Sequence, residues 1–436
     1  MKEKEVAGMR KFRVGWMMLL GLLLSLALAG CSSEDSSNNE SGSGDEKVKL
    51  TFWGDWTGDG EDQFNHMVDK FNESQDRIEV EYVIQEDLIT KFMTGITSGQ
   101  VPDVLLWDRW RTSLYAPKGV LHPINEYMEA DGISEGDFYE EALKELSYDD
   151  NLYGLPLTVD TRALFYNKDH FEEAGLEPPT TWEELREAAK KLTIKNGNDF
   201  ERVGFSLNDL GLFNMWLQQA GGQMLTDDLS STAYNSEAGL EVLEYWNQLL
   251  FEDQVYKTGF DKGLEGAQHP FVTGKSSMHF TGPWDLRTYE QYSDQLNYGV
   301  VPPPAGPNGD KGAVMGGFGL AVPEASEKKE AAWEFIKWWL AEPENALEWG
   351  KTSLNIPGNK VALEDPFFQD DPFWKPFIDS LEFAKIRPVH PGYSVAEVDA
   401  LIPNLEKFVL QEQSAEETLE KAQKEGDRML KENEVK

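Results

Sequence analysis

Residues 152–169 most constrain how this chain can fold, because a regular pattern stops there and starts again. Tyr153-Gly154 is a turn signal, and Pro156 has no N–H to donate to a neighbouring strand. Residues 155–160 therefore suit an extended link better than a central strand. The apolar, aromatic run 162–167 that follows is typical of a buried strand. We expect two lobes joined by extended segments, with a cleft between them.

The residues before this passage form one continuous alternation of strand and helix patterns. Two segments carry apolar residues at helical spacing, and three read as strands. This order predicts a parallel sheet with right-handed crossovers, and ligands bind at the carboxyl ends of the strands in such sheets. Trp53 and Trp107 both fall at predicted strand ends. We predict strands at 48–53, 78–84 and 102–107, and helices at 62–72 and 87–98.

The rest of the chain restarts the α/β pattern as a second body. The glycine-rich residues 316–323 and residues 352–357 are two further candidate crossings between the lobes. At 436 residues the chain has room for about two domains of ordinary size. We predict helices at 182–192, 212–220, 236–251, 262–272, 328–340, 371–384 and 403–435, and strands at 276–280 and 298–304.

Residues 1–30 have the pattern of a signal peptide, with a basic start and an apolar run at 14–29. This run is shorter than the ~20 apolar residues that a membrane span needs. It ends Leu28-Ala29-Gly30-Cys31, which resembles the cleavage box of bacterial lipoproteins. The resemblance implies that Cys31, the only cysteine, is acylated; a stray or buried thiol is the alternative. We expect residues 31–46 to be a flexible linker, and the resemblance implies that the protein is anchored on the extracytoplasmic face of a bacterial cell membrane.

The formal net charge of −38 limits the possible partners. A field of this sign repels nucleic acid and anionic lipid headgroups, so no nucleic-acid binding is expected. Solubility near a membrane is the simpler explanation of the charge. The six histidines show no ligand spacing, no loop has EF-hand spacing, and Gly-x-Ser-x-Gly and Walker motifs are missing. We therefore predict no metal, no cofactor and no catalytic residue.

Tryptophan is the residue type that indicates a ligand. The chain has fourteen, and several stand just after strands or in turns. Indole faces pack on the C–H faces of sugar rings, while carboxylate and guanidinium groups bond the hydroxyls. Any one of these rings could equally be core, and Trp333, Trp338 and Trp339 are predicted as core. The candidates with polar neighbours are Trp53 and Trp56 beside Asp55, Trp107 and Trp110 beside Asp108 and Arg111, and Trp284 beside Asp285.

Several motifs between residue 48 and the C-terminus occur together. They are Leu-Thr-Phe-Trp at 50–53, Pro102-Asp103-Val104 with Trp107, the passage from Tyr153 to Lys168, Gly282-Pro283-Trp284, and the glycines before Leu320. With them the chain resembles an extracellular solute-binding lipoprotein of an ATP-binding cassette sugar importer, in the family that includes maltose- and multiple-sugar-binding proteins. The resemblance implies an α/β, two-lobed fold of the type II periplasmic-binding-protein class. It implies an N-lobe of 47–157 and 319–353 and a C-lobe of 158–318 and 354–436.

The same resemblance implies a binding protein rather than an enzyme. A sugar, an oligosaccharide in view of the many tryptophans, is captured between the lobes by a monomer and delivered to membrane permease subunits. The ligand-binding residues that it implies are Trp53, Asp55, Trp107, Asp108, Arg111, Asp160, Phe213, Trp216, Trp284 and Tyr393. Asn208, Asp209 and Asp285 are added for their polarity and position.

Two other functions fit some of these observations. A secreted glycosidase would also carry tryptophan platforms, but it needs a pair of carboxylates flanking the bond to be cut. The chain has 78 acidic residues, and the sequence singles out no such pair. A surface sensor or adhesin could use the same binding fold without taking part in uptake.

Overall fold

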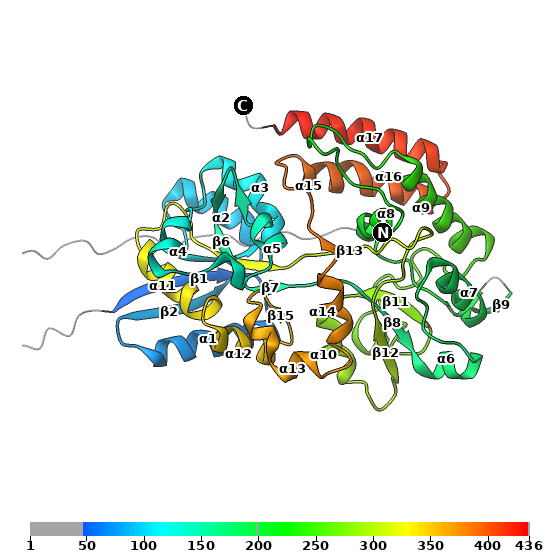
Figure 1. Ribbon diagram of the computed structural model, residues 1–436, viewed down its shortest axis with the longest axis horizontal. Coiled ribbons are helices and arrows are strands. Elements are labelled where there is room, and N and C mark those ends of the chain that lie inside the picture. The colour runs from blue at the N-terminus through cyan, green and yellow to red at the C-terminus, as the bar shows by residue number, and fades with distance from the viewer. Residues whose placement is uncertain (1–46, 198, 435–436) are drawn as a thin grey trace, which may run out of the picture. The chain divides into compact units, whose positions relative to one another are not determined.

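The computed structural model describes residues 47–197 and 199–434. The predicted signal peptide, the Cys31 lipidation site and the linker up to residue 46 lie outside these residues. The described chain forms two α/β lobes, and their helices and strands can be followed in Figure 1.

A five-stranded sheet forms the centre of the N-terminal lobe. β1 pairs in parallel with β2 and β3, while β14 pairs antiparallel with β3 and β6. The predicted order of strand, helix, strand, helix, strand is confirmed, with α1 (Asp59–Ser74) and α2 (Leu88–Ser98) as the helices. Across the sheet the strands lie in the order β2 (Ile78–Ile84), β1 (Val48–Gly54), β3 (Val104–Asp108), β14 (Phe318–Ala321) and β6 (Gly154–Pro156).

Apolar periodicity explains how the helices of this lobe cover the sheet. α1 buries Phe64, Met67, Val68 and Phe71, which recur at the spacing of one helical face. α11 (Lys329–Leu340) buries Trp333 and Trp339 as predicted, and the half-buried Trp338 packs against the same core. The other helices of the lobe are α3 (Thr112–Tyr115), α4 (Asn125–Asp131), α5 (Glu140–Glu145) and α12 (Pro343–Ser353).

A three-stranded antiparallel sheet forms the centre of the C-terminal lobe, with β8 (Ala163–Asn167) between β11 (Met278–Thr281) and β12 (Tyr298–Val301). Because side chains alternate along a strand, Leu164 packs into one core cluster and Phe165 into another. The helices of this lobe include α6 (Lys168–Ala174), α7 (Trp182–Leu192), α8 (Phe213–Gln219), α9 (Glu237–Asn247), α10 (Trp284–Glu290), α13 (Pro366–Gln369), α14 (Lys375–Leu381), α15 (Tyr393–Ala396), α16 (Ile402–Val409) and α17 (Ala415–Glu432).

Three segments connect the lobes. Residues 157–162 lead from β6 to β8, and residues 315–317 lead from β13 (Ala313–Val314) to β14. We call these two the crossing segments. β15 (Ile356–Pro357) follows α12 and pairs antiparallel with β7 (Thr158–Val159), which forms the third connection. Short pairs of strands complete the fold: β4 (Ser147–Tyr148) with β5 (Asn151–Leu152), β9 (Ile194–Asn196) with β10 (Asp199–Arg202), and β13 with β16 (Ala384–Lys385).

Two predicted helices are wrong. Residues 262–272 form turns with one short 3-10 segment, Gly266–Gln268, because Gly263 and Gly266 adopt positive φ angles of 75° and 53° that no right-handed helix contains. The segment predicted as one helix over 403–435 contains two separate helices, α16 and α17. Gln411 has a φ of 60°, and Ser414 starts α17 with a capping box to Glu417, so the chain ends one helix and begins another.

Candidate ligand-binding site

A pocket of about 440 Å³ lies between the loop after β1, α1, the crossing segment 157–162, the start of β14, the end of α12 and the start of α10. Two of the predicted site residues, Asp160 and Trp284, line it. Trp56 and Gln63 come from the N-terminal lobe and Arg287 from α10. The other lining residues are Thr158, Phe318, Ser353 and Asn355.

Trp284 presents the largest exposed aromatic surface at this pocket, with 43% of the residue accessible. It is the first residue of α10 and follows β11 by a Gly-Pro turn. A Cβ atom at Gly282 would overlap the benzo edge of the indole, so only glycine lets the ring lie back on the turn. The Arg162 guanidinium lies over the ring, with Cζ 4.5 Å from the centroid. The position of the Trp284 ring therefore depends on both Gly282 and Arg162.

Asp160 provides a fixed carboxylate beside this ring. Its backbone N–H donates to the Gly316 carbonyl oxygen at 3.1 Å, and the Gly316 N–H donates back to the Asp160 carbonyl at 3.0 Å. Arg162 Nη1 donates to Asp160 Oδ1 at 2.8 Å. The carboxylate keeps further acceptor capacity, which suits a hydroxyl-bearing ligand.

An ion pair crosses the pocket region from one lobe to the other. Arg287 Nη2, on α10, lies 3.2 Å from Asp59 Oδ2 at the start of α1. Both side chains are more than one third exposed, so the pair contributes only about 0 to 1 kcal/mol. This ion pair links the two lobes weakly, so it would not prevent them from moving apart.

Charges around the site are matched. Arg162 pairs with Asp160, Arg287 with Asp59, and Arg387 Nε with Glu397 Oε2 at 3.0 Å. Each of these guanidinium groups already has a carboxylate partner, so none requires an anionic ligand. The arrangement favours a neutral ligand over a uronate or a phosphate.

Trp56 is a pocket residue that the predicted set of site residues omitted. It is half-buried and packs edge-on against Phe318, with ring centroids 5.1 Å apart. Its position after β1 in a loop of Gly, Asp and Trp was the available signal. The sequence of a loop does not determine the direction in which a side chain points. The sequence therefore could not show that Trp56, and not Trp53, faces the pocket. Trp53 packs half-buried against the core of the N-terminal lobe and does not line the pocket.

Four residues that were predicted as ligand contacts, Trp107, Phe213, Trp216 and Tyr393, are buried in this structure, so their rings are not accessible to a ligand in it. Trp107 is fully buried in β3, and its Nε1 donates to Thr112 Oγ1 at 3.1 Å. Phe213 and Trp216 face the core from α8, where the helical pattern turns them inward. Tyr393 is buried on α15, and its hydroxyl donates to Glu397 Oε1 at 3.3 Å.

Asp285, the next residue on α10 after Trp284, does not line the pocket. Its carboxylate accepts a hydrogen bond from Thr281 Oγ1 at 2.7 Å, and burial raises its pKa above the ordinary value. Asp108 likewise is half-buried, accepts from Trp110 Nε1 at 2.5 Å, and has its pKa raised by burial. Arg111 lies over the Trp110 ring, with Cζ 4.6 Å from its centroid.

The remaining predicted residues lie outside the pocket. Asp55 and Asn208 are exposed. Asp209 is exposed too, and it borders a small hollow of about 60 Å³ that Arg162 and Gly316 also line. Asp160 does not line that hollow, and the role of Asp209 as a ligand contact stays a prediction.

Among residues 47–197 and 199–434, three or more His, Cys, Asp or Glu side chains never converge in a way that could hold a metal ion. No helix in this part of the chain combines the length and the apolar character needed to cross a bilayer.

Two α/β lobes, three connecting segments and a pocket at their junction define the type II class of periplasmic binding proteins. A solved structure of the cyclic α-maltosyl-1,6-maltose binding protein from Arthrobacter globiformis has this architecture. It superposes with a TM-score of 0.76 at 26% identity, covering 89% of this chain and 100% of that one.

Residues 66–375 match the family of bacterial extracellular solute-binding proteins, and this chain belongs to that family. A maltotriose-binding protein of Pyrococcus abyssi is 25% identical over 357 residues, 81% of this chain and 75% of that protein. A maltooligosaccharide ABC transporter solute-binding lipoprotein of Streptococcus pneumoniae is 25% identical over 361 residues, 78% of this chain and 79% of that protein.

Proposed function

We propose that this protein is the substrate-binding component of an ATP-binding cassette importer and that it captures a neutral oligosaccharide between its lobes. The observation that carries the proposal is the exposed Trp284 ring beside the Asp160 carboxylate in a pocket between the lobes. The names of the relatives support it, since they refer to maltotriose and maltooligosaccharides.

The chemistry of the pocket suits a sugar ring. The indole of Trp284 offers an apolar face, while Asp160, Gln63 and Asn355 offer acceptors and donors for hydroxyl groups. The paired arginines leave no unmatched positive charge to attract an acidic sugar. A ligand of several sugar units would extend from this pocket along the interface between the lobes.

Binding would act on the separation of the lobes. A sugar that contacts Trp56 in one lobe and Trp284 in the other stabilises the closed form more than the open form. A shift from 1:99 to 99:1 requires about 5.5 kcal/mol of such preference. The combined free energy of stacked rings and several hydrogen bonds is of this order. The permease subunits would then receive the closed form.

The protein acts as a binding protein and not as a glycosidase in this proposal. A glycosidase needs one carboxyl group free to protonate the leaving oxygen and a second one opposite it. Asp160, the carboxylate in the pocket, is instead paired with Arg162 at 2.8 Å. Incubation with oligosaccharides followed by chromatography would reveal cleavage. A deletion strain that keeps uptake of every sugar would favour a sensor or adhesin.

A panel of sugars tests the proposed function directly. We expect maltotriose and longer maltooligosaccharides, or another neutral oligosaccharide in the panel, to raise the melting temperature of the purified protein. A ligand at one hundred times its dissociation constant stabilises the folded state by about 2.7 kcal/mol. Calorimetry then gives the affinity. If no sugar raises the melting temperature while an amino acid or peptide does, the proposed ligand class is wrong.

The lobe boundaries and the anchor belong to the same proposal. We infer an N-lobe of 47–157 and 319–353 and a C-lobe of 158–318 and 354–436. The separate sheets of the two lobes support this division. We also infer that residues 1–30 are removed and that Cys31 carries the lipid. The lipoprotein of Streptococcus pneumoniae among the relatives supports this inference.

Replacing Cys31 with serine tests the anchor. The variant should leave the membrane fraction, because the thiol that would carry the acyl chains is gone. Cell fractionation with an antibody against the folded part gives the readout. Ser32→Ala, beside it in the linker, is the matched control and should stay with the membrane. Retention of the Cys31→Ser variant in that fraction would contradict lipidation at this residue.

A further inference from the structure

Arg162 contacts both recognition groups of the pocket, the Asp160 carboxylate and the Trp284 ring. Its Nη1 donates to Asp160 Oδ1 at 2.8 Å, and its Cζ lies 4.5 Å from the centroid of the ring. The Arg162 side chain is 20% exposed and that of Asp160 15%, so salt screens this ion pair less than it screens pairs on the open surface. One arginine therefore sets both the position of the indole and the net charge beside it.

Arg162 also lines the hollow of about 60 Å³ that Asp209 borders. This hollow has room for only a few water molecules, so a sugar ring cannot enter it. Arg387 lines the hollow too, but it is paired with Glu397 and does not replace Arg162 as the partner of Asp160. A ligand therefore meets the charge of Arg162 only through the pocket.

The contacts of Arg162 lie within one lobe. Asp160 and Arg162 belong to the crossing segment 157–162, and Trp284 begins α10. All three fall in the C-lobe as inferred above, and so do the residues that line the hollow. The charge beside the indole is therefore a property of this lobe and does not depend on how far the lobes are apart.

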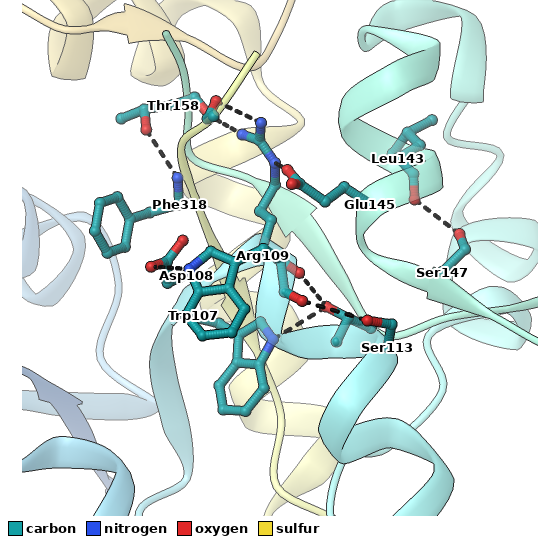
Figure 2. Close-up of polar contacts among 12 residues, drawn as sticks. Trp107, Asp108, Arg109, Ser113, Leu143, Glu145, Ser147, Thr158 and Phe318 are labelled. Atoms are coloured by element: carbon teal, nitrogen blue, oxygen red, sulfur yellow. Dashed lines mark hydrogen bonds and ion pairs between the residues drawn. The ribbon is translucent and has the colours of Figure 1, made fainter. Parts of the chain in front are cut away.

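The backbone that carries Asp160 is held in place by Arg109. This arginine is fully buried directly after β3, and its Nη1 donates to the Thr158 carbonyl oxygen, as Figure 2 shows. Its Nη2 donates to the Gly316 carbonyl oxygen at 2.5 Å, and Gly316 exchanges two backbone hydrogen bonds with Asp160. Arg109 thus makes a tight junction between β3 and both crossing segments. The backbone of Asp160 should therefore stay in place when a neighbouring side chain is replaced.

Without Arg162 the pocket would attract cations. A carboxylate binds an ammonium group in a charge-assisted hydrogen bond, and the face of an indole attracts a cation as well. The formal net charge of −38 adds to this attraction. Arg162 cancels the charge of Asp160 and repels a second cation, and repulsion of the wrong ligand is a common source of specificity.

We propose that Arg162 is a specificity-determining residue, whose charge makes the pocket select neutral sugars against amino sugars. This role deepens the proposed function and rests on it, because it requires that a sugar binds beside Trp284. The second oxygen of Asp160 stays available to the hydroxyl groups of a neutral sugar.

Replacing Arg162 with methionine tests this role, because methionine keeps an unbranched side chain against the ring and removes the charge. The probes are maltotriose, cellotriose and the glucosamine trisaccharide, which has the linkage of cellotriose and a protonated amino group in place of one hydroxyl on each ring. Calorimetry at about pH 6 should show that the wild type binds a neutral trisaccharide and rejects the glucosamine trisaccharide. Arg162→Met should bind the glucosamine trisaccharide about tenfold more tightly than the wild type, or better, as a charge-assisted hydrogen bond provides.

Two further variants separate charge from packing. Arg162→Lys keeps the charge and should reject the glucosamine trisaccharide as the wild type does. Arg162→Met combined with Asp160→Asn removes both charges and should lose the gain. A merely structural role would weaken the binding of all sugars alike in the three variants. If Arg162→Met bound the glucosamine trisaccharide no better than the wild type, or if Arg162→Lys bound it as tightly as Arg162→Met, the proposal would be wrong.

Fluorescence quenching without sugar tests the same charge independently of the proposed function. Caesium and iodide ions both quench exposed indole rings, and they carry opposite charges. The contribution of Trp284 is the difference between each protein and the same protein with Trp284→Phe. Quenching by caesium relative to iodide should rise several-fold in Arg162→Met. It should stay unchanged in Arg428→Ala, which removes an exposed arginine from α17.

The two measurements fail in different ways. An unchanged quenching ratio in Arg162→Met would overturn the role of Arg162, even if the wild type binds sugars. If the wild type bound none of the trisaccharides or other sugars, the proposed function would be contradicted. A raised quenching ratio would then still show that Arg162 keeps cations away from Trp284.

Discussion

Replacing Trp284 with alanine is expected to weaken oligosaccharide binding by about thirtyfold or more, which corresponds to about 2 kcal/mol. The ring is 43% exposed at the pocket, so its surface is available to a ligand and contributes little to the core. Calorimetry with the best sugar of the panel measures the loss. The free energy of unfolding should change by less than about 1 kcal/mol, because exposed side chains seldom contribute more.

Two variants make this result specific. Trp284→Phe keeps a smaller aromatic face and should lose only part of the affinity. Trp338→Ala removes an indole from α11, which does not line the pocket, and should leave the affinity unchanged. If Trp284→Ala bound sugar as tightly as the wild type, the ligand would lie elsewhere between the lobes. The family assignment would stand, but the recognition chemistry proposed for this pocket would be wrong.

The N-terminal lobe shows which parts of the fold local sequence patterns can predict. β1, α1, β2, α2 and β3 were predicted because alternation and helical spacing are properties of neighbouring residues. The insertion of β14 between β3 and β6 was not predicted, since it joins segments about 200 residues apart in sequence and depends on tertiary packing. The false helix at 262–272 had apolar residues at plausible spacing, but two glycines in positive φ override that pattern.

The site was predicted less completely than the fold, for a physical reason. The resemblance to sugar-binding proteins implied Asp160 and Trp284 as ligand contacts, and both line the pocket. Position does not state which face the side chain takes. Both faces of β3 are buried as far as Trp107, and only Asp108, the last residue of the strand, is half-buried.

Arg109 illustrates what the sequence could not reveal at all. It stands in the Trp-Asp-Arg-Trp-Arg cluster, where Arg111 was chosen as the candidate ligand contact. Its partners Glu145, Thr158 and Gly316 lie 36, 49 and 207 residues away. Only folding brings these four residues into contact. Their close packing also explains why Gly317, in the second crossing segment, is a glycine.

Replacing Gly317 with alanine is expected to lower the free energy of unfolding by about 3 kcal/mol or more. Its φ of 130° is unfavourable for any residue with a side chain. An added Cβ would also overlap the Thr158 carbonyl oxygen and come within 2.6 Å of Arg109 Nη1. Neither atom can move away without breaking the bond between them. Urea unfolding measures the loss, and hydrogen exchange of residues 155–162 should rise with it.

Gly309→Ala is the matched control for this substitution. Gly309 also has a positive φ, 84°, but an added Cβ would meet nothing within 4 Å. It should therefore show only the backbone cost, about 1 to 2 kcal/mol. The difference between the two variants isolates the contact with Thr158 and Arg109 from the strain of the backbone. If both alanines cost the same, the crossing segments can shift freely around Arg109, and the tight junction inferred between the lobes does not exist.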